Sequence, residues 1–192
     1  MGLEFKISAV EYLSIKDKNA LIEAYRMYFA DCYGKDMVDS FLNVSNLKSN
    51  ESRKRDILKD YSDNYKNAIE VFENLISNSY YELLCIKKDN ILIGAGRLYS
   101  LNRDECGIKE IVFIEDDKKI TREVWKQTVS FVEKYFKEKH YKKMYIEIPY
   151  LEGPLLIRAD ELGFKEDPND IIVGKKEYTY LLNKELERNK DE

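Results

Sequence analysis

The chain has 192 residues, 44% of them hydrophobic, which suits one folded domain that buries its own core. Its formal net charge is -4, with 36 Asp and Glu against 32 Lys and Arg. Proteins that bind a phosphate backbone usually carry a basic face, so a nucleic acid is not an expected partner. No stretch approaches the ~18 apolar residues that cross a bilayer, so no membrane span is expected.

The three cysteines and the single histidine exclude several kinds of site. Cys32, Cys85 and Cys106 are widely spaced and form no C-x-x-C pair, which argues against a disulfide framework and against a thiolate zinc site. We therefore expect a reducing compartment. Met1 to Val10 has no apolar core of a signal peptide, so the predicted location is the cytoplasm. His140 is the only histidine, so neither a metal site nor a Ser-His-Asp triad is expected; its predicted role is to cap a helix C-terminus.

The first part of the chain predicts one strand and two long helices. Leu3 to Val10 alternates loosely between apolar and polar residues, as a half-buried strand does. A helical period then runs to Tyr33-Gly34, with Asp17 as the predicted N-cap. In the region 37–79 we predict a short helix, a Ser- and Asn-rich loop, and a long helix from Arg53 to Ser77.

After the second long helix the period of the apolar residues changes to two. Tyr81–Ile86 and Ile91–Tyr99 flank the polar turn Lys87–Asn90, which predicts an antiparallel hairpin. Gly94 and Gly96 interrupt the second strand. They indicate either a β-bulge with close backbone approach or room for packed helices, and both interpretations stay open.

The remaining elements are a strand, a long helix, a strand, a short helix and a last strand: Gly107–Ile114, the helix that Asp116 or Asp117 caps, Lys142–Ile148, Glu152–Leu162 and Glu177–Leu182. A helical crossover is expected to lay Lys142–Ile148 parallel to Gly107–Ile114. Gly163 follows the short helix, where a left-handed C-terminal cap belongs.

This order, closing on Ala159-Asp-Glu-Leu-Gly-Phe164, resembles the GNAT family of N-acetyltransferases. The resemblance implies one α/β (α+β) domain over residues 1–183, with an extended helical region at 37–79 and a charged tail at 184–192. Its sheet would be mixed and mostly antiparallel, with one parallel, splayed strand pair, and flanked by helices. The family's co-substrate is acetyl-CoA, whose pantetheine lies between the splayed strands and whose pyrophosphate lies at the next helix N-terminus.

The resemblance also implies which residues would bind acetyl-CoA. They are Val112, Phe113, Ile114, Lys119, Thr121 and Arg122. The family's pyrophosphate loop contains glycines, whereas Lys119–Trp125 contains none, and Arg122 and Val124 stand in their places. Either charged and hydroxyl side chains replace some backbone donors, or the pocket is filled and the cofactor no longer binds. Trp125 and Glu123 favour the second interpretation.

For catalysis, the resemblance places Glu110 as the base that deprotonates the amine. The residues alone equally allow a solvent-facing strand residue, and Glu147 is the reserve candidate. Many family members protonate the leaving thiolate with a Tyr where this chain has Ala159. Tyr150 is the candidate replacement, with Tyr145 as a second choice.

The expected function is acetyl transfer from acetyl-CoA to a primary amine of a small molecule or peptide, by direct attack. The alternative is a non-catalytic GNAT-fold binding module that has lost acetyl-CoA. The acceptor would enter beside the N-terminal helices, whose tyrosines either line an aromatic pocket or belong to the core: Tyr25, Tyr28, Tyr33 and Tyr61. The oligomeric state stays open, a homodimer being one candidate.

Overall fold

The computed structural model describes residues 2–33, 51–78, 82–114, 118–149, 152–166 and 179–186. The strands are β1 (Leu3–Ala9), β2 (Glu82–Lys88), β3 (Ile91–Ser100), β4 (Glu105–Phe113), β5 (Lys143–Pro149), β6 (Lys165–Glu166) and β7 (Thr179–Glu185). The helices are the 3-10 helix η1 (Val10–Tyr12), α1 (Ile15–Tyr33), α3 (Glu51–Ser77), α4 (Lys118–Glu138) and α5 (Gly153–Glu161). The short elements η1 and β6 were not predicted, because two or three residues show no period.

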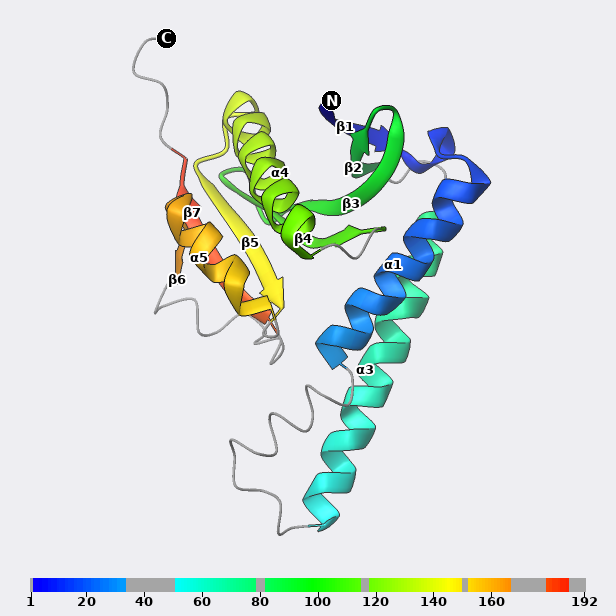
Figure 1. Ribbon diagram of the computed structural model, residues 1–192. Helices are drawn as coiled ribbons and strands as arrows, with labels where there is room; N and C mark the ends of the chain where they lie inside the picture. Colours follow the sequence, from blue (N-terminus) through cyan, green and yellow to red (C-terminus); the bar gives the residue numbers. More distant parts are fainter. Residues whose placement is uncertain are drawn as a thin grey trace.

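The strands form one seven-stranded sheet in the order β1-β2-β3-β4-β5-β7-β6 (Figure 1). Neighbouring strands are antiparallel except β4 and β5, which run parallel with α4 as the crossover. The predicted mixed, mostly antiparallel sheet with one parallel pair is therefore confirmed. The short helix expected within 37–50 and the caps Asp116 and Asp117 lie outside the described residues.

Helices pack on both faces of the sheet (Figure 1). On one face, Val129 and Val132 of α4 pack with Ile108 and Ile146 of the parallel strand pair. On the other face, α1 and α3 pack over a second apolar cluster that includes Val112 of β4. The sheet therefore separates two cores, and the parallel strand pair contributes to the core under α4.

Tyr25 belongs to the core and does not line a pocket. Its side chain is fully buried, and its ring stacks on Phe72 of α3 with centroids 3.6 Å apart. Tyr28 is half-buried against the same cluster. The side chains of Tyr33 and Tyr61 lie outside the described part of the chain.

Helix α1 begins at Ile15, three residues earlier than an N-cap at Asp17 predicts, and its N-cap is Ser14. The Ser14 carbonyl accepts the first helical hydrogen bond, from Lys18, at 3.0 Å. Ser14 Oγ accepts from the Asp17 N–H at 3.1 Å and donates to the Asp17 carboxylate at 2.8 Å. The prediction of Asp17 as N-cap was wrong, because Ser and Asp are equally good caps and the apolar period starts only at Leu21.

Helices α4 and α5 end in the same hydrogen-bonding pattern. After α4, Tyr141 N–H donates to Phe136 O at 3.1 Å, and His140 N–H to Lys137 O at 3.0 Å. This is a Schellman motif, with the rings of Phe136 and Tyr141 in edge contact at 5.4 Å. His140 (φ 64°) and Gly163 (φ 83°) occupy the left-handed position of the two motifs. The predicted capping positions of both residues are confirmed.

The last strand extends further than predicted. β7 continues to Glu185, and Leu186 is buried, so residues expected in the charged tail belong to the sheet. Lys184 Nζ lies 2.9 Å from both carboxylate oxygens of Glu133 on α4, and Lys137 lies 2.8 Å from one of them. Burial alone would raise the pKa of Glu133, but hydrogen bonds from Lys137 and Lys184 outweigh it and lower that pKa. No described helix is long and apolar enough to cross a membrane.

The left-handed backbone of His140 gives a prediction about stability. A residue with a Cβ pays about 1–2 kcal/mol of strain in this conformation, and glycine avoids that strain. Glycine also has more conformational entropy in the unfolded chain, which cancels part of the gain. We expect His140→Gly to raise the free energy of unfolding by about 0.5–1 kcal/mol in urea denaturation. Gly163→Ala, which introduces a Cβ at the matching position, should lower it by a similar amount. A lower denaturation midpoint for His140→Gly would contradict this assignment.

Candidate active site

Strands β4 and β5 separate partway along their length. Backbone pairing joins Glu105–Ile108 of β4 to Lys143–Ile146 of β5 and stops there. Beyond these residues β4 stays paired with β3, and β5 stays paired with β7. The two strands therefore form a fork that opens toward both of their C-terminal ends. The splayed parallel pair is present where the sequence placed it.

The N-terminus of α4 lies close to the open end of this fork. Only residues 114–117 connect β4 to α4, and such a connection spans at most about 19 Å. The first backbone N–H groups of a helix have no partner within the helix and carry partial positive charge. This end of the fork therefore favours an anionic group.

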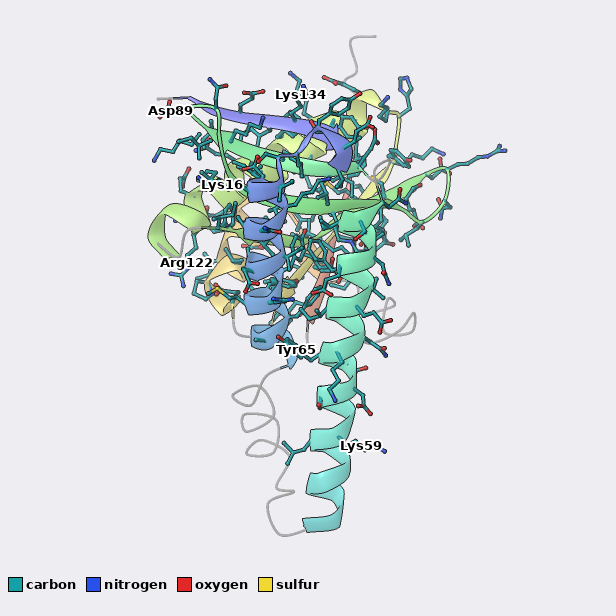
Figure 2. All side chains as sticks on the ribbon, turned by 90° about the vertical axis from the view of Figure 1, so that its right-hand side faces the viewer. Lys16, Lys59, Tyr65, Asp89, Arg122 and Lys134 are labelled. Atoms are coloured by element: carbon teal, nitrogen blue, oxygen red, sulfur yellow. The ribbon has the colours of Figure 1, made fainter. Side chains whose placement is uncertain are left out.

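Arg122 adds a buried donor at this end of α4. Figure 2 shows Arg122 beside the first turns of the helix. Its Nε atom is buried and donates no hydrogen bond to any group that the structure describes. A buried donor without an acceptor costs about 1–3 kcal/mol, so an anion that accepts from Arg122 would bind favourably. Lys119 and Thr121 lie in the first turn of α4, and their side chains are outside the described part.

Of the two residues expected to disfavour an anion at this helix end, Trp125 is placed so that its ring does not block one, whereas Glu123 keeps its negative charge. Trp125 is 3% exposed and packs into the core beneath α4. Glu123 is exposed and accepts a hydrogen bond from Gln127, one turn further along the helix, at 3.4 Å. The large ring is thus part of the core. The Glu123 carboxylate has only a neutral amide as its partner, so its charge still disfavours an anion nearby.

Glu110 lies in a β-bulge at the point where the fork begins. The register between β3 and β4 shifts between Ala95 and Arg97, so Gly96 alone faces Glu110 and Ile111. The backbone of Glu110 is left-handed, with φ of 53°. The extra residue bends β4 two residues after Ile108, which makes its last pair with β5.

Gly94 lies beside this bulge and allows β3 and β4 to approach closely. A Cβ at Gly94 would lie 2.6 Å from Val112 O and 2.9 Å from Phe113 Cδ1. Of the two interpretations of Gly94 and Gly96, the bulge with close backbone approach is therefore confirmed.

The bulge also changes which face of the sheet each β4 side chain joins. Before it, Ile108 packs under α4; after it, Ile111 and Phe113 do. Val112 and Ile114 pack on the opposite face, with α1 and α3. The residues predicted to bind the cofactor on β4 thus pack their side chains into the two cores, and their backbone is what borders the fork.

The Glu110 side chain is held by Arg97 of β3. Arg97 Nη1 lies 2.6 Å from Glu110 Oε2, and the two side chains are 14% and 8% exposed. The interpretation of Glu110 as a solvent-facing strand residue is therefore wrong. Sequence reasoning missed Arg97, because its contact with Glu110 depends on the bulge, and the glycines were the only signal of that bulge.

Tyr99 of β3 lies close to Tyr145 and Glu147 of β5. Burial, and then the Glu147 carboxylate, raise the pKa of the Tyr99 phenol far above its ordinary value, so Tyr99 stays a neutral hydroxyl. Tyr145 donates to Glu105 Oε1 at 3.3 Å, which ties its hydroxyl to the paired part of β4. Tyr150, the candidate acid, lies outside the described residues.

Other chemistries find little support in this part of the molecule. Cys85 and Cys106 are free and buried, and burial raises the pKa of Cys85 to about 11 and of Cys106 to about 12. Neither thiol is therefore a ready nucleophile. Across the described ranges, no three His, Cys, Asp or Glu side chains come together as a metal site.

The close approach at Gly94 gives a prediction about the sheet. The atom that a new Cβ would meet is a backbone oxygen, so β3 and β4 must move apart beside the bulge. We expect Gly94→Ala to lower the free energy of unfolding by about 1–3 kcal/mol in urea denaturation. Gly153→Ala is the matched control, because a Cβ there meets nothing within 4 Å. Equal midpoints for the two variants would show that β3 and β4 are not tightly packed here.

Comparison with solved structures identifies the fold. The PaiA N-acetyltransferase of Thermoplasma acidophilum, in complex with coenzyme A, matches with a TM-score of 0.53 at 20% identity, over 96% of this chain and 99% of its own. Ard1 of Thermoplasma volcanium gives 0.53 at 10% identity, over 96% and 99%. A protein of Desulfovibrio desulfuricans assigned to the GNAT family of acetyltransferases gives 0.52 at 8% identity, over 97% and 100%.

By sequence, no protein-family model and no curated protein matches the chain. The likeness is therefore one of architecture. Together with the mixed sheet, the forked strand pair and the crossover helix, it shows that this chain has the fold of the GNAT N-acetyltransferases.

Proposed function

We propose that the protein is an N-acetyltransferase that transfers the acetyl group of acetyl-CoA to a primary amine of a small molecule or peptide. The observation that carries the proposal is the β4–β5 fork, which has a helix N-terminus near its open end and a buried carboxylate, Glu110, where it begins. The structurally similar PaiA N-acetyltransferase was crystallised with coenzyme A.

The residues around the fork suit the shape and charge of acetyl-CoA. Its extended pantetheine arm can lie along the backbone of Val112, Phe113 and Ile114, where β4 no longer pairs with β5. Its pyrophosphate can accept hydrogen bonds from the first N–H groups of α4 and from Arg122 Nε. Lys119 and Thr121 are proposed to add charge and a hydroxyl donor there.

Glu110 is proposed to act as the base. The acceptor amine loses a proton to the carboxylate and attacks the thioester carbonyl carbon; a C–N bond forms, and the C–S bond breaks. Backbone N–H groups at the fork stabilise the oxyanion. The leaving thiolate then takes up a proton, for which Tyr150 stays the candidate donor. The attacking nitrogen still has to lose a second proton, and that proton returns to the Tyr150 phenolate. Ala159 is fully buried on the inner face of α5 and offers no acid.

The alternative function is a binding module that has lost acetyl-CoA. The feature that favours it is the start of α4, which carries no glycine from Lys118 to Trp125. Each of these residues carries a Cβ, and the missing glycines are the ones that let a loop backbone come close to phosphate. Binding of acetyl-CoA therefore decides between the two functions.

We expect acetyl-CoA to raise the thermal unfolding temperature of the protein in a dose-dependent way. A ligand at 100 times its Kd adds about 2.7 kcal/mol, or about 5–10 °C for a chain of this length. Arg122→Ala should remove most of that shift. Lys134→Ala is the matched control, since this exposed side chain lies far along α4 from Arg122 (Figure 2). No shift of the wild-type protein at millimolar acetyl-CoA would favour the binding module.

Glu110→Gln should lower turnover by about 10²-fold or more, because a positioned base contributes about that much. The shift in unfolding temperature with acetyl-CoA should stay as in the wild-type protein. Turnover is measured as release of free thiol with a panel of primary amines. Glu147→Gln is the parallel variant: a loss there together with unchanged turnover in Glu110→Gln would assign the base to Glu147.

A further inference from the structure

We infer that Arg97 is a positioning residue for Glu110, which holds one carboxylate oxygen in place and leaves the other for the acceptor amine. This inference rests on the proposed function and deepens it, because it explains how the Glu110 carboxylate is oriented toward the acceptor amine. Nothing in the sequence pattern marked Arg97, and the arrangement emerges only from the register of β3 and β4.

The contact is short, buried and directional. Arg97 Nη1 donates to Glu110 Oε2 at 2.6 Å, and both side chains are largely withdrawn from water, at 14% and 8% exposure. A guanidinium is planar and keeps its charge, so it restrains a carboxylate in one orientation better than a flexible ammonium does. Oε2 of Glu110 is therefore already hydrogen-bonded to Arg97.

The other oxygen remains for chemistry. Oε1 of Glu110 accepts no hydrogen bond from the residues that the structure describes. An ammonium group that approaches the fork can thus donate to Oε1 while Arg97 keeps the carboxylate from turning. The proton passes from the amine nitrogen to Oε1, and the freed lone pair attacks the thioester.

Neighbouring charges do not duplicate this role. Lys109 precedes Glu110 on β4, but its Nζ lies over the Tyr99 ring, 5.5 Å from the centroid. Glu147, on β5, is an acid and cannot restrain a carboxylate by attraction. Helix α1 contributes apolar and aromatic side chains to the core on the Val112 side of the sheet: Leu21, Ala24, Tyr25 and Phe29. Among the described residues, Arg97 is thus the cation that contacts Glu110.

The left-handed backbone of Glu110 makes such a restraint necessary. A bulge residue is left out of the regular ladder, so the neighbouring pairs of β4 fix its side chain less firmly than they fix a regular strand position. An error of about 1 Å in the place of a catalytic group can cost about 10²-fold in rate. The ion pair to β3 supplies the second anchor that the bulge removes.

The test combines four variants with turnover measurements. Arg97→Ala is expected to lower kcat by roughly 10²-fold with the KM for acetyl-CoA unchanged. Added guanidinium ion, at concentrations that do not unfold the protein, should restore part of that activity. In the double variant with Glu110→Gln, Arg97→Ala should cause no further loss, and guanidinium should restore nothing. Lys109→Ala, the matched control, should change kcat no more than a few-fold.

Two results would overturn the inference while the acetyltransferase stands. One is a kcat for Arg97→Ala that equals that of the wild-type protein. The other is an equal loss from Arg97→Ala with and without Glu110→Gln, which would show that Arg97 acts only on the fold.

Thermal unfolding tests the pair without any acetyl transfer. Arg97→Ala should lower the unfolding temperature by several degrees, because it leaves a buried carboxylate unpaired, and adding Glu110→Gln should recover part of the loss. If transfer fails with every amine but this coupling is found, the proposed function is wrong and the ion pair is real. Additive effects on unfolding would contradict the pair itself.

Discussion

The β-bulge in β4 is the constraint on which the site depends. One extra residue opposite Gly96 bends the strand two residues after its last pair with β5. It also reverses which β4 side chains face which side of the sheet. Val112 therefore joins the core under α1 and α3, while Ile111 joins the core under α4. A bulge at this place disrupts the regular ladder and so disfavours further pairing of β4 with β5. The inserted residue therefore favours the opening between the two strands.

Glu110, the residue at this bulge, has a strained backbone conformation. Glycine adopts a left-handed conformation without strain, whereas a glutamate there costs about 1–2 kcal/mol. A buried hydrogen bond to a charged group contributes about 1.5–3 kcal/mol, so the contact with Arg97 can offset that strain. Strain of this kind persists where the surrounding structure over-determines it, which is common at functional sites. The strained carboxylate at position 110 thus fits the role of base that we propose for Glu110.

The sequence predicted what depends on neighbours along the chain and missed what depends on strand register. Apolar periods, the hairpin turn and Gly163 are local signals, and the order of elements followed from them. Ser14 and Asp17 are equally suitable N-caps by residue type, so the sequence could not decide between them. The hydrogen bonds of the structure show that Ser14 is the cap. Arg97 and Glu110 are thirteen positions apart, and only a shifted register brings their side chains together. Two glycines indicated that shift without locating it.

The charges at the fork explain how an acidic protein could bind an acidic cofactor. The net charge of -4 would repel acetyl-CoA, but fields near a binding site depend on the nearest groups rather than on the total. The α4 N-terminus and Arg122 favour negative charge near the open end, while the Glu110 carboxylate, where the fork begins, favours the positive acceptor amine. The two substrates would therefore be drawn to different parts of one fork, with the reacting carbonyl between them. Under the proposed function, this separation of charge would let positioning supply much of the catalysis.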